Sequence, residues 1–339
     1  METLSIANDI KRKAHELGYD ICGTIPADSL KEYAVYLEKR IERFPKSRHF
    51  YEKLYDLGSP EKKEQWAKSI VVCVRRYSKY RIPPEISKYF GKVYLFDGRL
   101  THSEEYRSAI LFEEYLRSLG LKFFKDFTAA RWAAVKAGLG QFGKNNFLYT
   151  KYGSWVWIDT WTLDAEFEYD GPVAPIQACP ENCRKCIDAC PTGALSEPFA
   201  MDRGRCIAQL SFFSSDLPAN HLRDQMGTWL YGCDVCQDVC PKNRNAWVEE
   251  RDFPELDSLV DLLAPEKIAE MDEKVFLERI QPRFAYIGKK SIWIWKCNAI
   301  RAMANSEDQK YHSHIRKACN DCNENVKTMA SWACKKLGI

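Results

Sequence analysis

The stretch CPENCRKCIDACPTGAL, residues 179–195, decides how the rest of the chain is read. Its four cysteines are spaced x₃, x₂ and x₃ apart, and a proline follows the last one: Cys179, Cys183, Cys186 and Cys190. A second set follows with the same x₂ and x₃ spacing at its end and another proline: Cys206, Cys233, Cys236 and Cys240. Repeated motifs of this kind supply thiolates to [4Fe–4S] clusters.

The spacing also predicts which cysteines share a cluster. In bacterial ferredoxins with two clusters, the cysteine before the proline binds the cluster of the other motif. The same cross-pairing here assigns cluster A to Cys179, Cys183, Cys186 and Cys240. Cluster B is then bound by Cys190, Cys206, Cys233 and Cys236. One extra residue separates Cys179 from Cys183, and we expect Pro180 to accommodate it in a turn.

The alternative is that the eight cysteines bind two zinc ions, with four cysteine ligands for each ion. Zinc ribbons, however, require neither the two Cys-Pro endings nor the doubled spacing, so the pattern favours two [4Fe–4S] clusters. The remaining cysteines are scattered, and we expect them to be small buried side chains: Cys22, Cys73, Cys297, Cys319, Cys322 and Cys334.

Composition places few limits on the partners. The 339 residues suffice for two or three domains, and 45% hydrophobic with 29% charged residues is typical of a globular protein. The net charge of +3 says little about partners, and a basic surface would have to be local. No run approaches the roughly 20 apolar residues of a membrane span, and no apolar segment follows the first charges. We therefore expect a cytoplasmic protein without a membrane partner, in which cysteines bind metal rather than form disulfides.

The rest of the sequence predicts an α+β fold in three regions. Residues 1–170 contain short apolar runs typical of buried strands, at 20–25, 69–74 and 155–163, and a helix at 103–119 that begins after Ser103. Residues 171–245 contain the cysteine motifs. Residues 246–339 are mostly helical, with two alanine-rich helices at 296–304 and 326–337.

Several segments together resemble the epoxyqueuosine reductases. They are AGLGQFGKNNF at 137–147, Gly153-Ser154-Trp155, CPTGA at 190–194, WLYGCDVCQDVCP at 229–241 and the helical stretch 283–306. Members of this family are cobalamin-dependent [4Fe–4S] enzymes that complete queuosine in transfer RNA, and they are relatives of the reductive dehalogenases. The resemblance covers nearly the whole chain.

The resemblance implies a division of labour among the three regions. Residues 1–170 would form a nitroreductase-like domain that binds base-off cobalamin, 171–245 a ferredoxin-like domain with two clusters, and 246–339 a short helical domain similar to HEAT repeats. The clusters would pass single electrons to cobalt. The implied partners are tRNA and an electron donor such as flavodoxin or ferredoxin, and we expect a monomer.

The resemblance also indicates which residues contact cobalamin. They are Gly138, Gly140, Lys144, Asn145 and Asn146, the segment Gly153, Ser154 and Trp155, and Gln209 and Ser211 from the loop after Cys206. Glycines let backbone approach a large ligand, and amides can pair with the amides of a corrin. The alternative is a glycine-rich turn that closes a helix. The sequence has no D-x-H-x-x-G segment that would supply a lower histidine ligand.

The proton donor departs from the family pattern. In the family an aspartate lies thirteen positions before the alanine of AGLG, where this chain has Phe124. A deletion of two residues would give its role to Asp126, and the alternative is a solvated carboxylate. The family's D-Y-H segment is also missing, so Tyr106 is the second candidate, with Tyr94 as a further tyrosine in the same stretch.

Three functions remain open at this stage. The first is the reduction of an epoxide in tRNA, for which basic residues of the tail could form a groove: Arg283, Lys289, Lys290, Lys296 and Arg301. A solvated helix face is the alternative for these residues. The second is a reductase of a small molecule, similar to a dehalogenase. The third is an iron–sulfur electron carrier that serves a corrinoid partner.

Overall fold

A four-stranded antiparallel sheet forms the centre of the first part of the chain. In the computed structural model, which describes residues 3–171 and 179–339, the strand order is β1 (Ile21–Pro26), β2 (Ser69–Arg76), β6 (Val156–Leu163) and β3 (Phe123–Lys125). β2 is buried along its whole length except its last residue, because it lies between two strands and beneath helices on both faces. The three predicted strands and the α+β class are confirmed.

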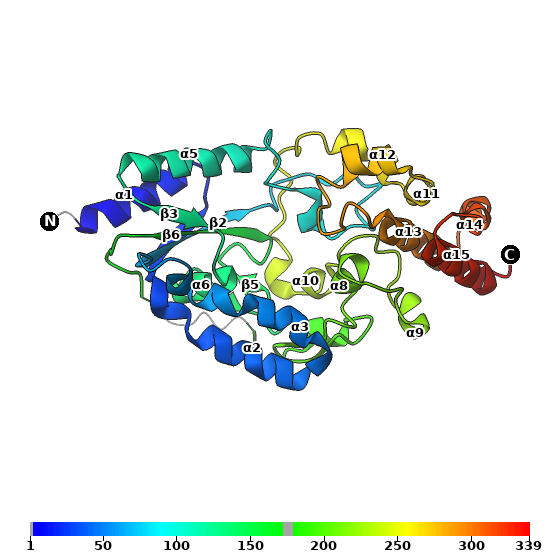
Figure 1. Ribbon diagram of the computed structural model, residues 1–339, viewed down its shortest axis with the longest axis horizontal. Coiled ribbons are helices and arrows are strands. Elements are labelled where there is room, and N and C mark those ends of the chain that lie inside the picture. The colour runs from blue at the N-terminus through cyan, green and yellow to red at the C-terminus, as the bar shows by residue number, and fades with distance from the viewer. Residues whose placement is uncertain (1–2, 172–178) are drawn as a thin grey trace.

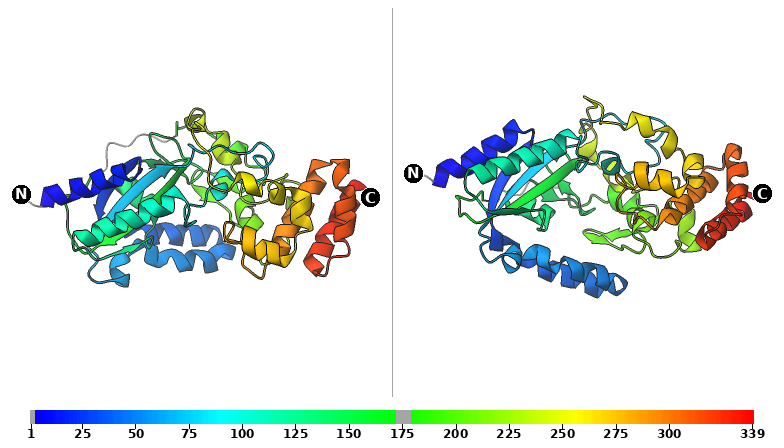
Figure 2. Two further views of the ribbon diagram at one scale, coloured as in Figure 1. Left: turned by 90° about the horizontal axis from the view of Figure 1, so that it is seen from above. Right: turned by 45° about the horizontal axis from the view of Figure 1, so that its top comes forward.

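Helices cover both faces of this sheet (Figures 1 and 2). On one face lie α1 (Thr3–Glu16) and α5 (Glu104–Ser118), and Ile10 and Phe112 pack there on Trp161 and its neighbours. On the other face lie α2 (Glu32–Arg43) and α6 (Ala130–Lys136), whose apolar residues pack on Ile70 and Val72. The predicted cap of α5 is confirmed, because the Ser103 hydroxyl accepts a hydrogen bond from the first turn of the helix.

The cysteine-rich region contains only short elements. Its small sheet is β7 (Leu195–Glu197) with β8 (Ala200–Met201), and a similar pair, β4 (Gln141–Phe142) with β5 (Leu148–Tyr149), lies in the first region. The short helices, including two from the first region, are α3 (Arg48–Tyr51), α4 (Pro60–Lys63), α7 (Lys185–Asp188), α8 (Ile207–Phe212), α9 (Asn220–Arg223) and α10 (Val235–Asp238). Such short elements bury little surface of their own, so their loops depend on neighbouring parts of the chain for support.

The last part of the chain is helical, as predicted. It contains α11 (Pro265–Ala269), α12 (Glu273–Val275), a π-helical turn (Phe276–Ile280), α13 (Ile292–Ser306), α14 (His312–Ala318) and α15 (Glu324–Leu337). α13 is enclosed by its neighbours, and Trp295 on it is fully buried. Residues 77–96 of the first region pack into the same core, where Phe90 lies 6.0 Å from Trp295 between ring centroids.

The shared core contains residues from more than one of the predicted domains. The division into 1–170, 171–245 and 246–339 stays a prediction, and residues 172–178, next to its first boundary, lie outside the described residues. The shared core joins 77–96 to the C-terminal helices, so contacts cross the predicted boundaries. Within the described ranges, no helix has both the length and the apolar character needed to cross a membrane.

Two of the basic residues expected in an RNA groove lie inside the protein instead. Arg301 is fully buried and donates hydrogen bonds to the carbonyl oxygens of Gly227, at 2.6 Å, and of Trp229. Arg283 is 5% exposed and donates to the carbonyl oxygen of Leu95 at 3.1 Å. The interpretation of the tail as a basic groove is therefore wrong for these two residues, which bind backbone.

The packing of α5 on the sheet makes Phe112 a test of the fold. Its ring is fully buried and lies 4.6 Å from that of Trp161 between centroids. We expect Phe112→Ala to lower the free energy of unfolding by about 3–5 kcal/mol, because a large cavity remains. The neighbouring Leu111→Ala is the control, since Leu111 is 49% exposed. Denaturant unfolding followed by circular dichroism measures both, and equal effects would contradict the described orientation of α5.

Candidate functional site

The eight motif cysteines lie in two adjoining groups. Burial, followed by the nearby thiols of Cys179, Cys183 and Cys240, raises the pKa of Cys186 to about 11. These four residues are the set expected for cluster A. Free thiols with a raised pKa stay protonated at neutral pH, so metal binding must displace their protons.

The second group is the set expected for cluster B. Burial first, and then Asp234 and the thiols of Cys206 and Cys190, raise the pKa of Cys233. Burial also raises the pKa of Cys236, with further contributions from neighbours that include Cys186 of the first group. The structure thus brings together the two sets that the spacing indicates, and their assignment as ligands stays a prediction. Within the described ranges, no three His, Cys, Asp or Glu side chains converge as the ligands of a single ion would.

Lys144 supports the first cysteine loop. Its backbone N–H lies 3.5 Å from the sulfur of Cys179, and its ammonium donates to the carbonyl oxygens of Pro180, at 3.0 Å, and Cys183, at 2.9 Å. The N–H of Cys183 also donates to the Pro180 carbonyl at 3.1 Å, which confirms the predicted turn. Lys144 therefore contacts the loop of cluster A, and it does not line the cavity described next.

A cavity of about 590 Å³ lies between the cysteine loops and the sheet. We call the wall formed by Cys190, Cys206, Gln209, Cys233 and Cys236 its cysteine side. Its sheet side is formed by Arg75, Glu105, Lys125, Asp126 and Asp159. Asn145, Asn146 and Ser154 also line it. The cavity thus has cysteines that could bind an electron-transferring cluster on one side and several ionisable side chains on the other.

Asp126 occupies a special backbone position on the sheet side. It directly follows β3 and has a φ of 57°, in the left-handed region that aspartate tolerates better than most residues. Its N–H donates to the Thr160 carbonyl at 2.9 Å, and its carboxylate accepts from the Thr160 N–H at 3.2 Å. This pairing with β6 fixes the direction of the carboxylate.

The electrostatic environment of Asp126 suits an acid. The Lys125 ammonium lies 3.4 Å from carboxylate oxygens of both Asp126 and Asp159. Partial removal from water at the cavity wall, where the side chain is still 53% exposed, and then the negative charge of Asp159 raise the pKa of Asp126 despite this lysine. A carboxyl with a raised pKa retains its proton at higher pH than an ordinary aspartate, so it can donate one to a bound ligand.

The cavity fits a large ligand with many amide groups. Among its buried polar atoms, Asn146 Nδ2 and Gln209 Oε1 have no hydrogen-bond partner in the part of the chain that the structure describes. An unpartnered buried donor or acceptor costs about 1–3 kcal/mol, which a ligand that pairs with it recovers. The described residues that line the cavity include no histidine. These residues therefore fit cobalamin bound in the base-off form, through side-chain amides and without an imidazole of the protein.

The two predicted glycines of the AGLG segment serve the backbone locally. Gly138 has a φ of 70° and donates to the Val135 carbonyl at 3.0 Å, which closes α6. A Cβ on Gly140 would lie 2.5 Å from the carbonyl oxygen of Tyr149, so the small residue permits the pairing of β4 and β5. Neither glycine lines the cavity, as the alternative interpretation of a helix-closing turn predicts.

Some of the other residues predicted to contact cobalamin line the cavity, and the rest are buried elsewhere. Asn145, Asn146, Ser154 and Gln209 line the cavity. Gly153, with a φ of 80°, packs against Asn243, and Trp155 is buried in the core. Ser211 is also buried, and its hydroxyl accepts from the N–H of Gly232 at 2.9 Å. These three residues do not line the cavity.

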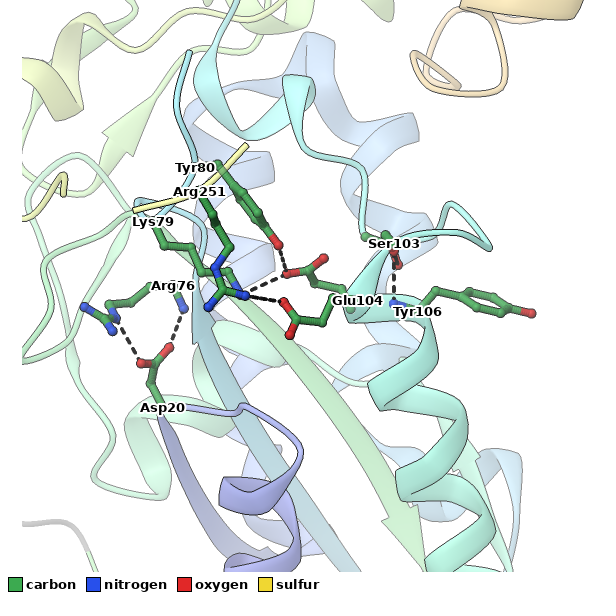
Figure 3. Close-up of polar contacts among 10 residues, drawn as sticks. Asp20, Arg76, Lys79, Tyr80, Ser103, Glu104, Tyr106 and Arg251 are labelled. Atoms are coloured by element: carbon green, nitrogen blue, oxygen red, sulfur yellow. Dashed lines mark hydrogen bonds and ion pairs between the residues drawn. The ribbon is translucent and has the colours of Figure 1, made fainter. Parts of the chain in front are cut away.

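The tyrosine candidates differ in position. Tyr106 lies in the first turn of α5 and does not line the cavity, and Figure 3 shows its ring pointing away from Tyr80 and Lys79. Tyr94 does line the cavity, and burial raises the pKa of its hydroxyl. Of the three candidates for the proton donor, Asp126 and Tyr94 thus line the cavity and Tyr106 does not, and the identity of the donor stays a prediction.

Sequence reasoning missed four charged residues of the sheet side: Arg75, Glu105, Lys125 and Asp159. Two signals could have found them. Arg75 ends the apolar run SIVVCV inside a strand, where a charge needs a polar destination. Glu105 shares a helix face with the buried residues Ala109 and Phe112, at spacings of four and seven.

Comparisons with known proteins agree with this geometry. Residues 178–243 match the family model described as a 4Fe-4S double cluster binding domain. An epoxyqueuosine reductase of Leadbetterella byssophila is 35% identical, over 70% of this chain and 80% of that protein. One of Aliivibrio fischeri is 30% identical, over 98% of this chain and 92% of that protein. A solved epoxyqueuosine reductase with a tRNA-Tyr stem loop has the same fold, with a TM-score of 0.81, 24% identity and coverage of 100% and 92%.

The cysteine groups generate a prediction about iron content. Anaerobically prepared protein should contain about eight iron atoms per chain, four for each cube. We expect Cys233→Ala to lower this toward about four, because one ligand of cluster B is lost. Cys322→Ala is the control, since Cys322 lies outside both groups and is exposed, so the expectation that it is buried is wrong. Zinc in place of iron, or equal losses in the two variants, would contradict the assignment.

Proposed function

The chain belongs to the epoxyqueuosine reductase family, and we propose that it reduces the epoxide of epoxyqueuosine in tRNA. In this proposal base-off cobalamin binds in the cavity and two [4Fe–4S] clusters supply the electrons. The observation that carries the proposal is the wall of the cavity, which combines cysteines of cluster B with Asp126 on the opposite, sheet side. Electrons and a proton can therefore reach one bound substrate.

The reaction sets requirements that particular residues meet. Loss of an epoxide oxygen as water takes two electrons and two protons. Cobalamin, when bound, supplies a metal centre that accepts single electrons and reacts with the substrate. The cysteine loops hold the electron source beside the cavity, and Asn145 fixes one of them by donating to the carbonyl oxygen of Cys236 at 2.9 Å. The cavity walls limit access of water to the reacting groups.

Asp126 is the proposed proton donor. Its carboxylate is held by β6, and its raised pKa favours the protonated form. After it donates, the Lys125 ammonium at 3.4 Å stabilises the resulting carboxylate. The contribution of Lys125 is thus to position and stabilise, whereas Asp126 contacts the reacting atoms.

The exposed loop of cluster A suggests where an external electron donor would bind. The loop of cluster A is close to the surface, and residues 180–182, 184 and 185 are exposed there. An external donor such as flavodoxin or ferredoxin could approach cluster A at this loop, and cluster B lies next to it on the cavity. We further infer that the protein acts as a monomer in the cytoplasm, where tRNA and reduced donors are present.

The proposed reaction can be tested directly. Protein loaded with clusters and cobalamin is mixed anaerobically with a strong reductant and an epoxyqueuosine-containing tRNA, and the nucleosides are analysed by mass spectrometry. We expect loss of one oxygen atom from the modified nucleoside. If the tRNA is unchanged although cobalamin binds, the small-molecule reductase replaces this proposal. If cobalamin does not bind at all, the electron-carrier function replaces it.

The role of Asp126 predicts a pH dependence. A general acid is active in its protonated form, so turnover should fall as the pH rises through the raised pKa of Asp126. We expect Asp126→Asn to lower turnover roughly a hundred- to ten-thousandfold and to remove this decline with pH. Asp28→Asn is the control, because the Asp28 carboxylate pairs with Lys31 on the surface and does not line the cavity. A fully active Asp126→Asn variant with the original pH profile would show that another group donates the proton.

A further inference from the structure

On the sheet side of the cavity, a lysine lies between two carboxylates. The Lys125 ammonium, at the end of β3, is 3.4 Å from an oxygen of Asp126 and 3.4 Å from an oxygen of Asp159 on β6. All three residues line the cavity. With both acids ionised, the group has two negative charges and one positive charge, so a single bound proton makes it neutral. What surrounds each acid decides which of them holds that proton.

Asp159 has a donor on each of its two oxygens. Its Oδ2 accepts a hydrogen bond from the Tyr19 hydroxyl at 2.8 Å, and its Oδ1 is the atom that faces Lys125. Tyr19 is held in turn, because it is 2% exposed and the Arg75 guanidinium lies 3.7 Å from the centroid of its ring. The direction of the Asp159 carboxylate is therefore fixed.

The other titratable groups near Asp159 favour its ionised form. Burial lowers the pKa of Arg75, but Tyr19, Asp159 and then Glu105 of α5 raise it above its usual value, so the guanidinium stays charged. On β2, Cys73 lies opposite Asp159, and burial raises the pKa of its thiol, which therefore adds no charge.

Asp126 has a different environment from Asp159. It has a share of the Lys125 ammonium and one backbone N–H, that of Thr160 at 3.2 Å. Asp159 has Lys125, a hydroxyl donor and the nearby charge of Arg75. Because more positive charge surrounds Asp159, the single proton of the group is held on Asp126.

We propose that Asp159 is a positioning residue that keeps a proton on Asp126. Asp159 stays ionised and draws Lys125 toward itself, so the charge of the ammonium is divided between the two carboxylates. Without Asp159, Lys125 would pair with Asp126 alone and hold it as a carboxylate, which has no proton to give. The two acids thus differ in role, since Asp126 donates a proton and Asp159 exchanges none.

The charges balance over one proton transfer. Asp126 gives its proton to the substrate oxygen and becomes a carboxylate, and the Lys125 ammonium offsets the new charge. Burial lowers the pKa of Lys125, but Asp159 and Asp126 raise it above its usual value, so the ammonium keeps its own proton. Water then restores the acid, because the Asp126 side chain is 53% exposed. The inference rests on the proposed function in one respect, namely that Asp126 is the donor.

The test measures the protonation of Asp126 without turnover. Protein that contains ¹³C-labelled aspartate and is loaded with clusters and cobalamin is titrated with base and followed by infrared spectroscopy. The carboxylic acid band that Asp126→Asn lacks belongs to Asp126, and its loss with pH gives a midpoint. We expect Asp159→Asn to move this midpoint to lower pH, because a repelling charge is removed and Lys125 pairs with Asp126 alone. Lys125→Met should move it to higher pH, because an attracting charge is removed.

Two further variants accompany this pair. Asp164→Asn is the matched control, since Asp164 directly follows β6 and does not line the cavity, and its midpoint should equal that of the unchanged protein. Tyr19→Phe removes the hydroxyl donor from Asp159, which then binds a proton more readily. We expect this variant to move the Asp126 midpoint to lower pH, by less than Asp159→Asn does. Iron content and the cobalamin spectrum should stay unchanged in all variants.

The direction of the shifts separates this role from a structural one. A midpoint that stays in place in both Asp159→Asn and Lys125→Met, or moves the same way in both, would overturn the inference. With the epoxyqueuosine-containing tRNA, the pH at which turnover declines should move in parallel with the midpoint. Opposite shifts of the midpoint in a protein that leaves the tRNA unchanged would refute the proposed function and keep the inference.

Discussion

A buried network of hydrogen bonds joins the second cysteine loop to the sheet, and the rest of the site depends on it. The hydroxyl of Ser154 donates to Gln237 at 2.8 Å and accepts from Asn243 at the same distance. The N–H of Ser154 donates to the Asn243 side chain at 2.9 Å, and Asn145 reaches Cys236. All four polar side chains are less than a tenth exposed. Because such groups are costly when unpaired, the network permits few other arrangements of loop and sheet.

Because of this junction, one cavity lies between the cysteine loop and the acidic side chains of the sheet. The segment that contains Asn145 and Ser154 leads directly into β6, which holds Asp159 and pairs with Asp126. The same segment is bonded to the loop that carries Cys233 and Cys236. An ion or cluster bound by the loop therefore has a fixed relation to the acids of the sheet. A reductase needs this relation, because electrons and protons must reach the same substrate atom, whereas an electron carrier does not.

The sequence allowed much of this arrangement to be predicted, for physical reasons that differ between elements. Long apolar runs such as 69–74 predict a buried strand because few other structures accommodate them. The cysteine spacing predicts the two groups because a short loop around a cluster limits where ligands can lie. The family motif predicts that Lys144 and Gly140 contact cobalamin, but Lys144 binds the neighbouring cysteine loop and Gly140 permits the pairing of β4 and β5.

The sheet side could not be predicted in the same way. Arg75, Glu105 and Asp159 come from a strand, a helix and another strand, and only the pairing of β2 with β6 and the packing of α5 bring them together. For basic residues of the C-terminal helices the prediction is wrong in the opposite way, because it expects a surface position for side chains that are buried. The charge of Arg301 predicts a surface position, whereas in the fold its guanidinium donates to carbonyl groups of an internal loop. Local sequence indicates that Arg75 and Glu105 need a polar environment, but it does not specify which residues they or Arg301 contact.

The most direct measurement of the central claim is anomalous diffraction from crystals grown anaerobically with cobalamin. Data collected at the iron and cobalt absorption edges locate the two metals independently. We expect two iron clusters, one at each cysteine group, and a single cobalt inside the cavity between the cysteine side and Asp126. Cobalt bound elsewhere, or iron at one group only, would contradict the account, because the cavity would then not be the place where electrons and protons meet.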